Sequence, residues 1–114
     1  MKPGELVLIR FPEASLEPGK LRPALVVAIA PGRYADVLLA LVTSRGYQEV
    51  PDFDEVISVA DEDFAATRLK STSVIRLARL VTVEAGIIEG RLGVISTARL
   101  QRIRQRLIEW LRKR

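Results

Sequence analysis

Short runs of aliphatic and β-branched residues, separated by turns rich in proline, glycine or charge, fill the first 95 residues of the chain. Runs of this length and composition are typical of strands. The predicted strands cover residues 5–11, 22–30, 35–43, 54–59 and 72–83, with a turn or brief strand at 87–90. The first is apolar enough to be buried on both faces, 54–59 alternates like a half-exposed strand, and 72–83 is either one bent strand or two short ones.

The periodicity changes at Ser96. From there apolar residues recur at helical spacing, at Leu100, Ile103, Leu107, Trp110 and Leu111, and Ser96 is a suitable N-cap. A short helix is also predicted near 61–67, because three acidic residues precede FAATR and favour a first helical turn. The expected fold is mainly β with helices: a small curved antiparallel sheet or barrel with a C-terminal amphipathic helix, in one domain of residues 1–114.

Histidine and cysteine are both absent from the 114 residues. Their absence excludes disulfides, thiolate nucleophiles, zinc sites of cysteine or histidine, and a histidine general base. Catalysis would have to use carboxylates, hydroxyls, arginine, lysine, tyrosine or a metal bound by oxygen. The chain also lacks a secretory leader and an apolar run of 18 residues, which predicts a cytosolic protein without a membrane span.

The positive charge is concentrated at one end of the sequence. The net charge is +4 and the sequence pI is about 10.0, values that favour nucleic-acid binding. However, residues 96–114 carry seven basic residues and one acid, whereas residues 1–95 have a net charge of −2. Three compatible interpretations of the basic helix follow. It packs its apolar face on the sheet and leaves its arginines in solvent, it contacts RNA phosphates, or it docks an acidic partner segment.

Two polar clusters are candidate sites. The loop at 12–21 is longer than most hairpin loops and ends in a charged group, Glu17, Lys20 and Arg22. A solvated loop closed by an ion pair is the simplest interpretation. Thr43 and Ser44 end the third predicted strand directly before Arg45, and hydroxyls beside a guanidinium can bind a phosphate. An ordinary turn that begins with Thr-Ser is the alternative there.

Five ordered segments resemble the PemK/MazF toxins of type II toxin–antitoxin systems. They are GELVLIRF at 4–11, RPALVV at 22–27, LVTS at 41–44, Leu69-Lys70 with SVIRL at 73–77, and RLGVIS at 91–96. The resemblance implies an SH3-like barrel with added helices that forms homodimers. It also implies a metal-independent endoribonuclease that cuts single-stranded RNA with the RNA's own 2′-hydroxyl and leaves a cyclic phosphate. An antitoxin would wrap the dimer and cover the RNA groove, and its acidic tail would be the partner segment of the basic helix.

The resemblance also implies roles for particular residues. Arg22 matches the family's catalytic loop arginine, Thr43 its active-site threonine, and Glu17 a functional glutamate of some members. Arg76 corresponds to an arginine that contributes to catalysis in another branch. The implied catalytic residues are therefore Arg22, Thr43 and Glu17, with no metal or other cofactor. The implied RNA-binding residues are Ser15, Lys20, Ser44, Arg45 and Arg76.

The sequence departs from the family pattern at three places. The first loop has Ala14-Ser15-Leu16-Glu17 where members often have Gly-Ser-Glu, and Leu21 stands where a basic residue is common. The branch that uses the strand arginine has an aspartate base two residues later, where this chain has Ala78. The base role therefore shifts to Glu17, with Arg22 as an electrostatic clamp and Thr43 holding a phosphate oxygen. The alternative function is a non-catalytic protein of the same fold, either a gyrase inhibitor or a binder of RNA or antitoxin.

Overall fold

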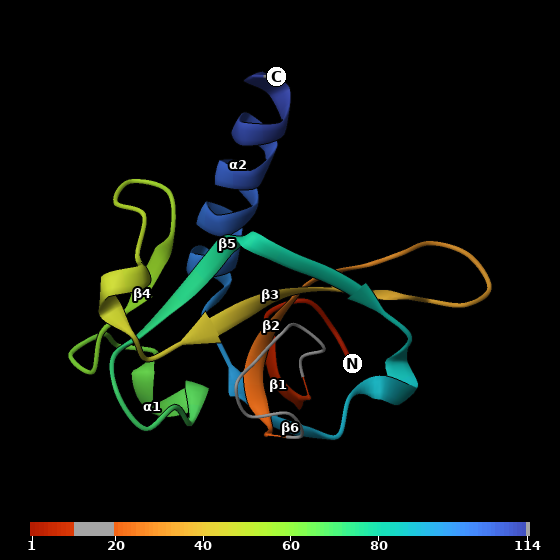
Figure 1. The fold of residues 1–114 in the computed structure, drawn as a ribbon, viewed down its shortest axis with the longest axis horizontal. Coiled ribbons are helices and arrows are strands. Elements are labelled where there is room, and N and C mark those ends of the chain that lie inside the picture. Colours follow the sequence, from red (N-terminus) through yellow and green to blue (C-terminus); the bar gives the residue numbers. More distant parts are fainter. Residues whose placement is uncertain (11–19, 114) are drawn as a thin grey trace.

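A single curled antiparallel sheet is the centre of the computed structural model, which describes residues 1–10 and 20–113. Within these residues six strands pair in the order β4-β5-β3-β2-β1-β6 (Figure 1). The strands are β1 (Glu5–Ile9), β2 (Arg22–Ile29), β3 (Val37–Thr43), β4 (Glu55–Ile57), β5 (Ser73–Val83) and β6 (Gly90–Val94). The expected fold class, a curved antiparallel sheet with added helices, is therefore confirmed.

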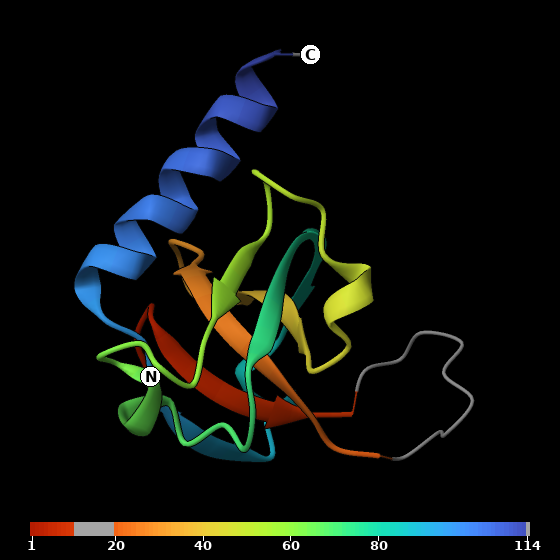
Figure 2. The same cartoon turned by 90° about the vertical axis from the view of Figure 1, so that its left-hand side faces the viewer.

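The helices lie outside this sheet. The long helix α2 (Thr97–Lys113) runs along one side of it, and its last turns extend past the strands (Figure 2). The Ser96 hydroxyl accepts a hydrogen bond from the Arg99 backbone N–H at 3.2 Å, so the predicted N-cap is confirmed. Three short helices connect strands: η1 (Gly46–Gln48), α1 (Phe64–Thr67) and η2 (Ala85–Ile87). In the described part of the chain, no helix is long and apolar enough to cross a membrane.

Strand β5 is one continuous bent strand, which settles the choice left open for residues 72–83. Its register against β3 shifts between Ala40, which pairs with Leu80, and Leu41, which pairs with Arg76. Three extra residues of β5 are accommodated at that point, and such an irregularity bends a strand. The bend is visible where β5 crosses the sheet in Figure 1.

Both faces of the sheet are buried, which explains the near-continuous apolar runs of its central strands. One face packs against α2 and includes Leu6, Leu25, Ala40, Val42, Ile75 and Leu77, together with Ile103 and Leu107 of the helix. The other face has a second core of Val7, Ile9, Ala24, Val26, Val37 and Leu39. The prediction that the first strand is buried on both faces is confirmed by Leu6, Val7 and Ile9.

One local prediction was wrong and another was right only in part. The segment 54–59 is not a half-exposed strand, because Glu55 is only 4% exposed and lies under the arginines of α2. The short helix predicted near 61–67 is present as α1, but it begins at Phe64. The acidic residues before it do not form a first helical turn, because Asp61 and Asp63 bind Arg99 instead. In both cases a distant arginine determines where the carboxylate lies.

Helix α1 packs directly on β6 at Gly93. A Cβ added at this glycine would clash with the backbone of Ala66 and Thr67. Glycine is therefore required here by the close approach of two backbones. The contact holds α1, and with it the acidic segment before the helix, against the sheet.

Candidate functional site

The ends of β2 and β3 bring two of the proposed catalytic residues together. The two strands are antiparallel, and Ala24 pairs with Leu41. Arg22 at the start of β2 and Thr43 at the end of β3 each lie two residues beyond this pair, so strand alternation puts Arg22 on the face of Ala24 and Thr43 on the face of Leu41. Residues that lie opposite each other in a sheet present their side chains on the same face. The sheet register therefore places Arg22 and Thr43 on one face, at the adjoining ends of β2 and β3.

The next strand adds Arg76 to this face. Leu41 pairs with Arg76 of β5, and Thr43 pairs with Val74. Side chains along a strand alternate between faces, so Arg76 shares the face of Leu41 and Thr43. This is also the face of Ala24, which belongs to the core on the side away from α2. We call Arg22, Thr43 and Arg76 the candidate site.

Arg76 is held in place by partners that sequence reasoning missed. Its Nε lies 3.1 Å from Asp54 Oδ2, close enough for an ion pair although the N–H does not point at that oxygen. Its Nη1 donates a hydrogen bond to Gln48 Oε1 at 3.3 Å. The Asp54 carboxylate is buried and accepts backbone N–H groups of Val50 and Leu77, each at 2.9 Å. The carboxylate beside Arg76 thus comes from Asp54, the residue directly before β4, and not from position 78.

Asp54 could not be recognised from the local pattern. It is the first residue of the segment that alternates polar and apolar residues, and this pattern predicts that a carboxylate there is exposed to solvent. Its partners Leu77 and Arg76 lie more than twenty residues further along the chain. Burial of this carboxylate therefore depends on long-range pairing between β4 and β5.

The remaining predicted residues lie around the candidate site or outside the described chain. Thr43 Oγ1 accepts the Arg45 backbone N–H at 3.1 Å, so the turn that Thr-Ser begins is present. The hydroxyl hydrogen of Thr43 is still available to donate to a ligand. Ser44 and Arg45 are exposed after this turn, and Lys20 is exposed just before β2. Ser15 and Glu17 lie outside the described residues.

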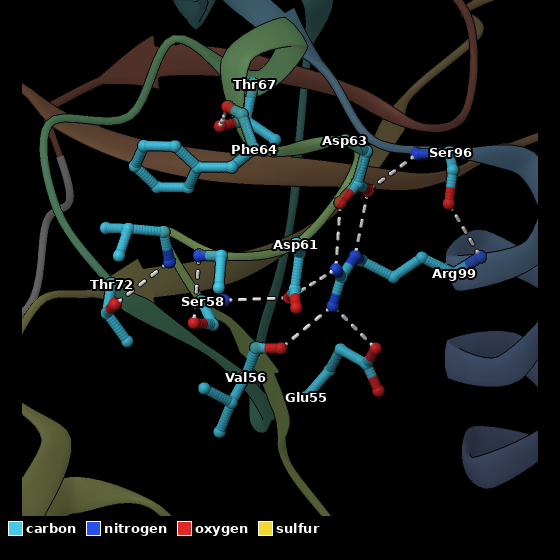
Figure 3. Close-up of polar contacts among 12 residues, drawn as sticks. Glu55, Val56, Ser58, Asp61, Asp63, Phe64, Thr67, Thr72, Ser96 and Arg99 are labelled. Carbon is cyan, nitrogen blue, oxygen red and sulfur yellow. Dashed lines mark hydrogen bonds and ion pairs between the residues drawn. The ribbon is translucent and has the colours of Figure 1, made fainter.

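The arginines of α2 bind the body of the protein. Arg99 is buried, and its guanidinium donates to Glu55, Asp61 and Asp63 and to the backbone oxygen of Val56, at 2.8–2.9 Å (Figure 3). Asp63 binds it through both carboxylate oxygens, which is the strongest geometry for this pair. The pKa of Asp63 is lowered to about 2, first of all by the hydrogen bonds from Arg99. The pKa of Asp61 is lowered mainly by the Ser58 backbone N–H and next by Arg99.

Three more arginines of the helix are engaged in the same way. Arg102 binds Glu55 at 2.7 Å and Arg106 binds it at 3.0 Å. Arg104 donates to the Val27 backbone oxygen at 2.7 Å. The interpretation that the helix leaves its arginines in solvent is therefore right only in part: Arg102, Arg104 and Arg112 are exposed. Carboxylates and carbonyls nevertheless bind four of the helix arginines. Much of the local positive charge is offset within the fold.

The apolar stripe of α2 is buried only in part. Ile103 and Leu107 are in the core, whereas Trp110 is 41% exposed and Leu111 is 67% exposed. These two residues lie on the turns that extend past the sheet. The Trp110 ring meets Phe53 edge to face, with 5.3 Å between ring centroids. Trp110 is therefore only partly buried, and its ring packs against Phe53, which precedes β4.

Among the described residues, no group of three or more carboxylates is arranged to hold a metal ion. A family model described as PemK-like, MazF-like toxin of type II toxin-antitoxin system matches residues 2–111, nearly the whole chain. No curated protein matches the sequence at a significant level.

Proposed function

Because this chain belongs to the PemK-like, MazF-like toxins of type II toxin–antitoxin systems, we propose that it is an endoribonuclease that cleaves single-stranded RNA. The observation that supports this proposal best is the shared face of Arg22, Thr43 and Arg76. Two guanidinium groups and a hydroxyl on three adjacent strands can surround one phosphate. The proposed activity is specific for short sequences and needs no metal ion.

The proposed reaction is an in-line displacement at phosphorus. The 2′-oxygen of the RNA forms a bond to phosphorus, and the bond from phosphorus to the 5′-oxygen of the next nucleotide breaks. The products are a 2′,3′-cyclic phosphate and a 5′-hydroxyl end. The 2′-hydroxyl proton goes to a base, for which Glu17 is the candidate, and the leaving 5′-oxygen takes a proton from water.

The positively charged residues stabilise the transition state. The phosphorane carries more negative charge than the ground-state phosphate, so donors fixed in advance lower its free energy. Arg22 stays protonated and acts as a clamp on the non-bridging oxygens. Thr43 donates to one of these oxygens. Arg76 adds a second positive charge, and its contacts with Asp54 and Gln48 fix the orientation of its guanidinium group. Ser15, Lys20, Ser44 and Arg45 are proposed to bind the neighbouring phosphates.

The family implies an antitoxin as the partner of this chain. We propose that the toxin acts as a homodimer in the cytosol and that an acidic tail of the antitoxin covers the candidate site. Such a tail would neutralise Arg22 and Arg76 in the way that a phosphate does. Inhibition and substrate binding would then compete for the same positive charges.

The test is incubation of the purified protein with a long RNA in EDTA, followed by mapping of the cut ends. We expect cuts at a recurring short sequence, each with a cyclic phosphate on one side. Arg22→Ala should lower the rate by about 10²-fold or more, as loss of one preorganised donor does. Arg33→Ala is the matched control, because Arg33 is exposed in the turn at the other end of β2.

Two results would contradict the proposal. If folded wild-type protein leaves RNA intact but still binds it or an antitoxin, the non-catalytic alternative is correct. If Arg22→Ala and Arg33→Ala cleave equally fast, the cleavage comes from another site or from a contaminating nuclease.

A further inference from the structure

A tyrosine beside the candidate site has no role in the proposed reaction. Tyr47 is 80% exposed, more than the other large apolar or aromatic residues of the described chain. It lies at the centre of η1, which follows directly after Thr43, Ser44 and Arg45. An aromatic side chain left in water beside a proposed phosphate site is available to contact the ligand itself.

The backbone around Tyr47 is fixed to the candidate site although its side chain is free. Gln48 binds Arg76 through its side chain at 3.3 Å, and its backbone N–H donates to the Arg45 oxygen at 3.0 Å. Before it, the Arg45 N–H donates to the Thr43 hydroxyl at 3.1 Å. Tyr47 is thus held between two connections to the candidate site, one through Thr43 and one through Arg76.

We propose that Tyr47 is a stacking platform for a base of the RNA whose phosphate lies at the candidate site. This inference rests on the proposed function and adds a residue that binds the nucleotide next to the cleaved bond. Single-stranded RNA is commonly bound by splayed bases stacked on aromatic rings. Tyrosine suits this role, because it offers a rigid surface and loses little conformational entropy on binding.

The chemistry around Tyr47 favours RNA over a protein as the occupant. Exposed aromatic residues also occur at protein interfaces. Here, however, the two residues before η1 are the exposed Ser44 and Arg45, which suit a phosphate. A base on the ring and a phosphate on these residues would belong to one nucleotide strand.

The test measures binding without cleavage. The probe is a fluorescently labelled single-stranded RNA of mixed sequence with 2′-O-methyl groups, which cannot supply the attacking hydroxyl. Anisotropy gives its Kd for wild type, Tyr47→Ala, Tyr47→Phe and Tyr34→Ala. Tyr34 is the matched control: it is 76% exposed but lies in the turn before β3, at the opposite end of that strand from Thr43.

We expect Tyr47→Ala to raise Kd by about 5- to 100-fold, the range that loss of one stacked base produces. Tyr47→Phe and Tyr34→Ala should bind like wild type. The slope of log Kd against log salt should stay unchanged in Tyr47→Ala, because stacking releases no counterions. In Arg45→Ala that slope should become shallower by about 1, as loss of one phosphate contact predicts.

Several outcomes would overturn the inference. Tyr47→Ala binding as tightly as Tyr34→Ala removes the stacking role, and a shallower salt slope in Tyr47→Ala means that the residue acts on phosphate contacts. If sedimentation shows that Tyr47→Ala changes the oligomeric state and leaves Kd unaltered, the ring belongs to an interface between protein chains. Wild-type thermal unfolding of the variant excludes misfolding as the cause.

Cleavage of unmodified RNA is measured separately to keep the two proposals apart. If wild type cleaves RNA in an Arg22-dependent manner while Tyr47→Ala cleaves and binds normally, only the stacking inference fails. If wild type binds the methylated RNA through Tyr47 but cleaves nothing, the nuclease proposal fails and the stacking role stands. Absence of any RNA binding by wild type refutes both.

Discussion

Replacement of Asp63 by asparagine should remove a large, pH-dependent share of the stability of this fold. Asp63 binds Arg99 with both carboxylate oxygens and also accepts the Ser96 backbone N–H at 3.0 Å. These contacts lower its pKa from 3.8 to about 2. A pKa difference of this size between folded and unfolded chains corresponds to about 2 kcal/mol at neutral pH.

The direction of the pH dependence follows from the sign of that difference. Because the folded chain holds the proton less tightly than the unfolded chain, acid favours unfolding. The stabilisation is complete above about pH 5, falls to roughly half at pH 3 and is nearly lost at pH 2. Asp63→Asn has no such carboxylate, so its difference from wild type should shrink along the same curve.

Urea unfolding followed by the fluorescence of the single tryptophan, Trp110, measures this difference at several pH values. Glu62→Gln is the matched control, because it removes the neighbouring exposed carboxylate and leaves the contacts of Arg99 intact. We expect it to follow the wild-type profile. A difference between wild type and Asp63→Asn that stays constant from pH 7 to pH 2, or is absent at pH 7, would refute the reasoning.

Four further results are expected. Gly93→Ala should destabilise the fold by about 1–3 kcal/mol in urea unfolding because its Cβ meets the backbone of α1, whereas Gly86→Ala, which faces open space, should be near neutral. If both variants lose the same stability, the close approach of α1 to β6 does not exclude a side chain at position 93. Glu17→Gln should lose the acidic limb of the pH–rate profile of RNA cleavage, and retention of that limb would assign the base to another group. The double variant Arg102→Ala/Arg106→Ala should lower the urea midpoint but leave the salt slope of RNA binding unchanged, and a shallower slope would restore a role of the helix in RNA contact. EDTA should not change the cleavage rate, and loss of activity that Mg²⁺ restores would contradict the metal-independent mechanism.

The parts of the fold that depend on neighbouring residues could be predicted from the sequence. The Ser96 cap and the helical stripe through Ile103 and Leu107 are local patterns, and they appear as expected. The bend in β5 was foreseen only as one of two choices, since the register shift at Ala40 depends on pairing with β3. Five of the six described strands were predicted, whereas β6 at Gly90–Val94 lies beyond the turn or brief strand predicted at 87–90.

The long-range charge pairs could not be predicted. The local sequence patterns predict that Glu55 is an exposed residue of an alternating strand and that Arg99 lies on a solvated helix face. The two residues are 44 positions apart in the sequence and form an ion pair. Because each charge is neutralised by the other, both side chains can be buried. The same holds for Asp54 and Arg76. For the candidate site, the sequence indicated Arg22, Thr43 and Arg76 by resemblance, whereas their common face follows from the strand register.

The order of strand pairing also bears on when this chain can fold during its own synthesis. Strand β6 pairs with the edge of β1 that β2 leaves open. Arg99 of α2 neutralises the carboxylates of Glu55, Asp61 and Asp63. Chains fold from the N-terminus as the ribosome makes them. Strands β1 to β5 can therefore pair early, but one edge of β1 and three carboxylates stay uncovered until residues 90–113 have emerged. We expect the nascent toxin to remain incompletely folded until residues 90–113 have emerged, so that its folding is completed only at the end of translation.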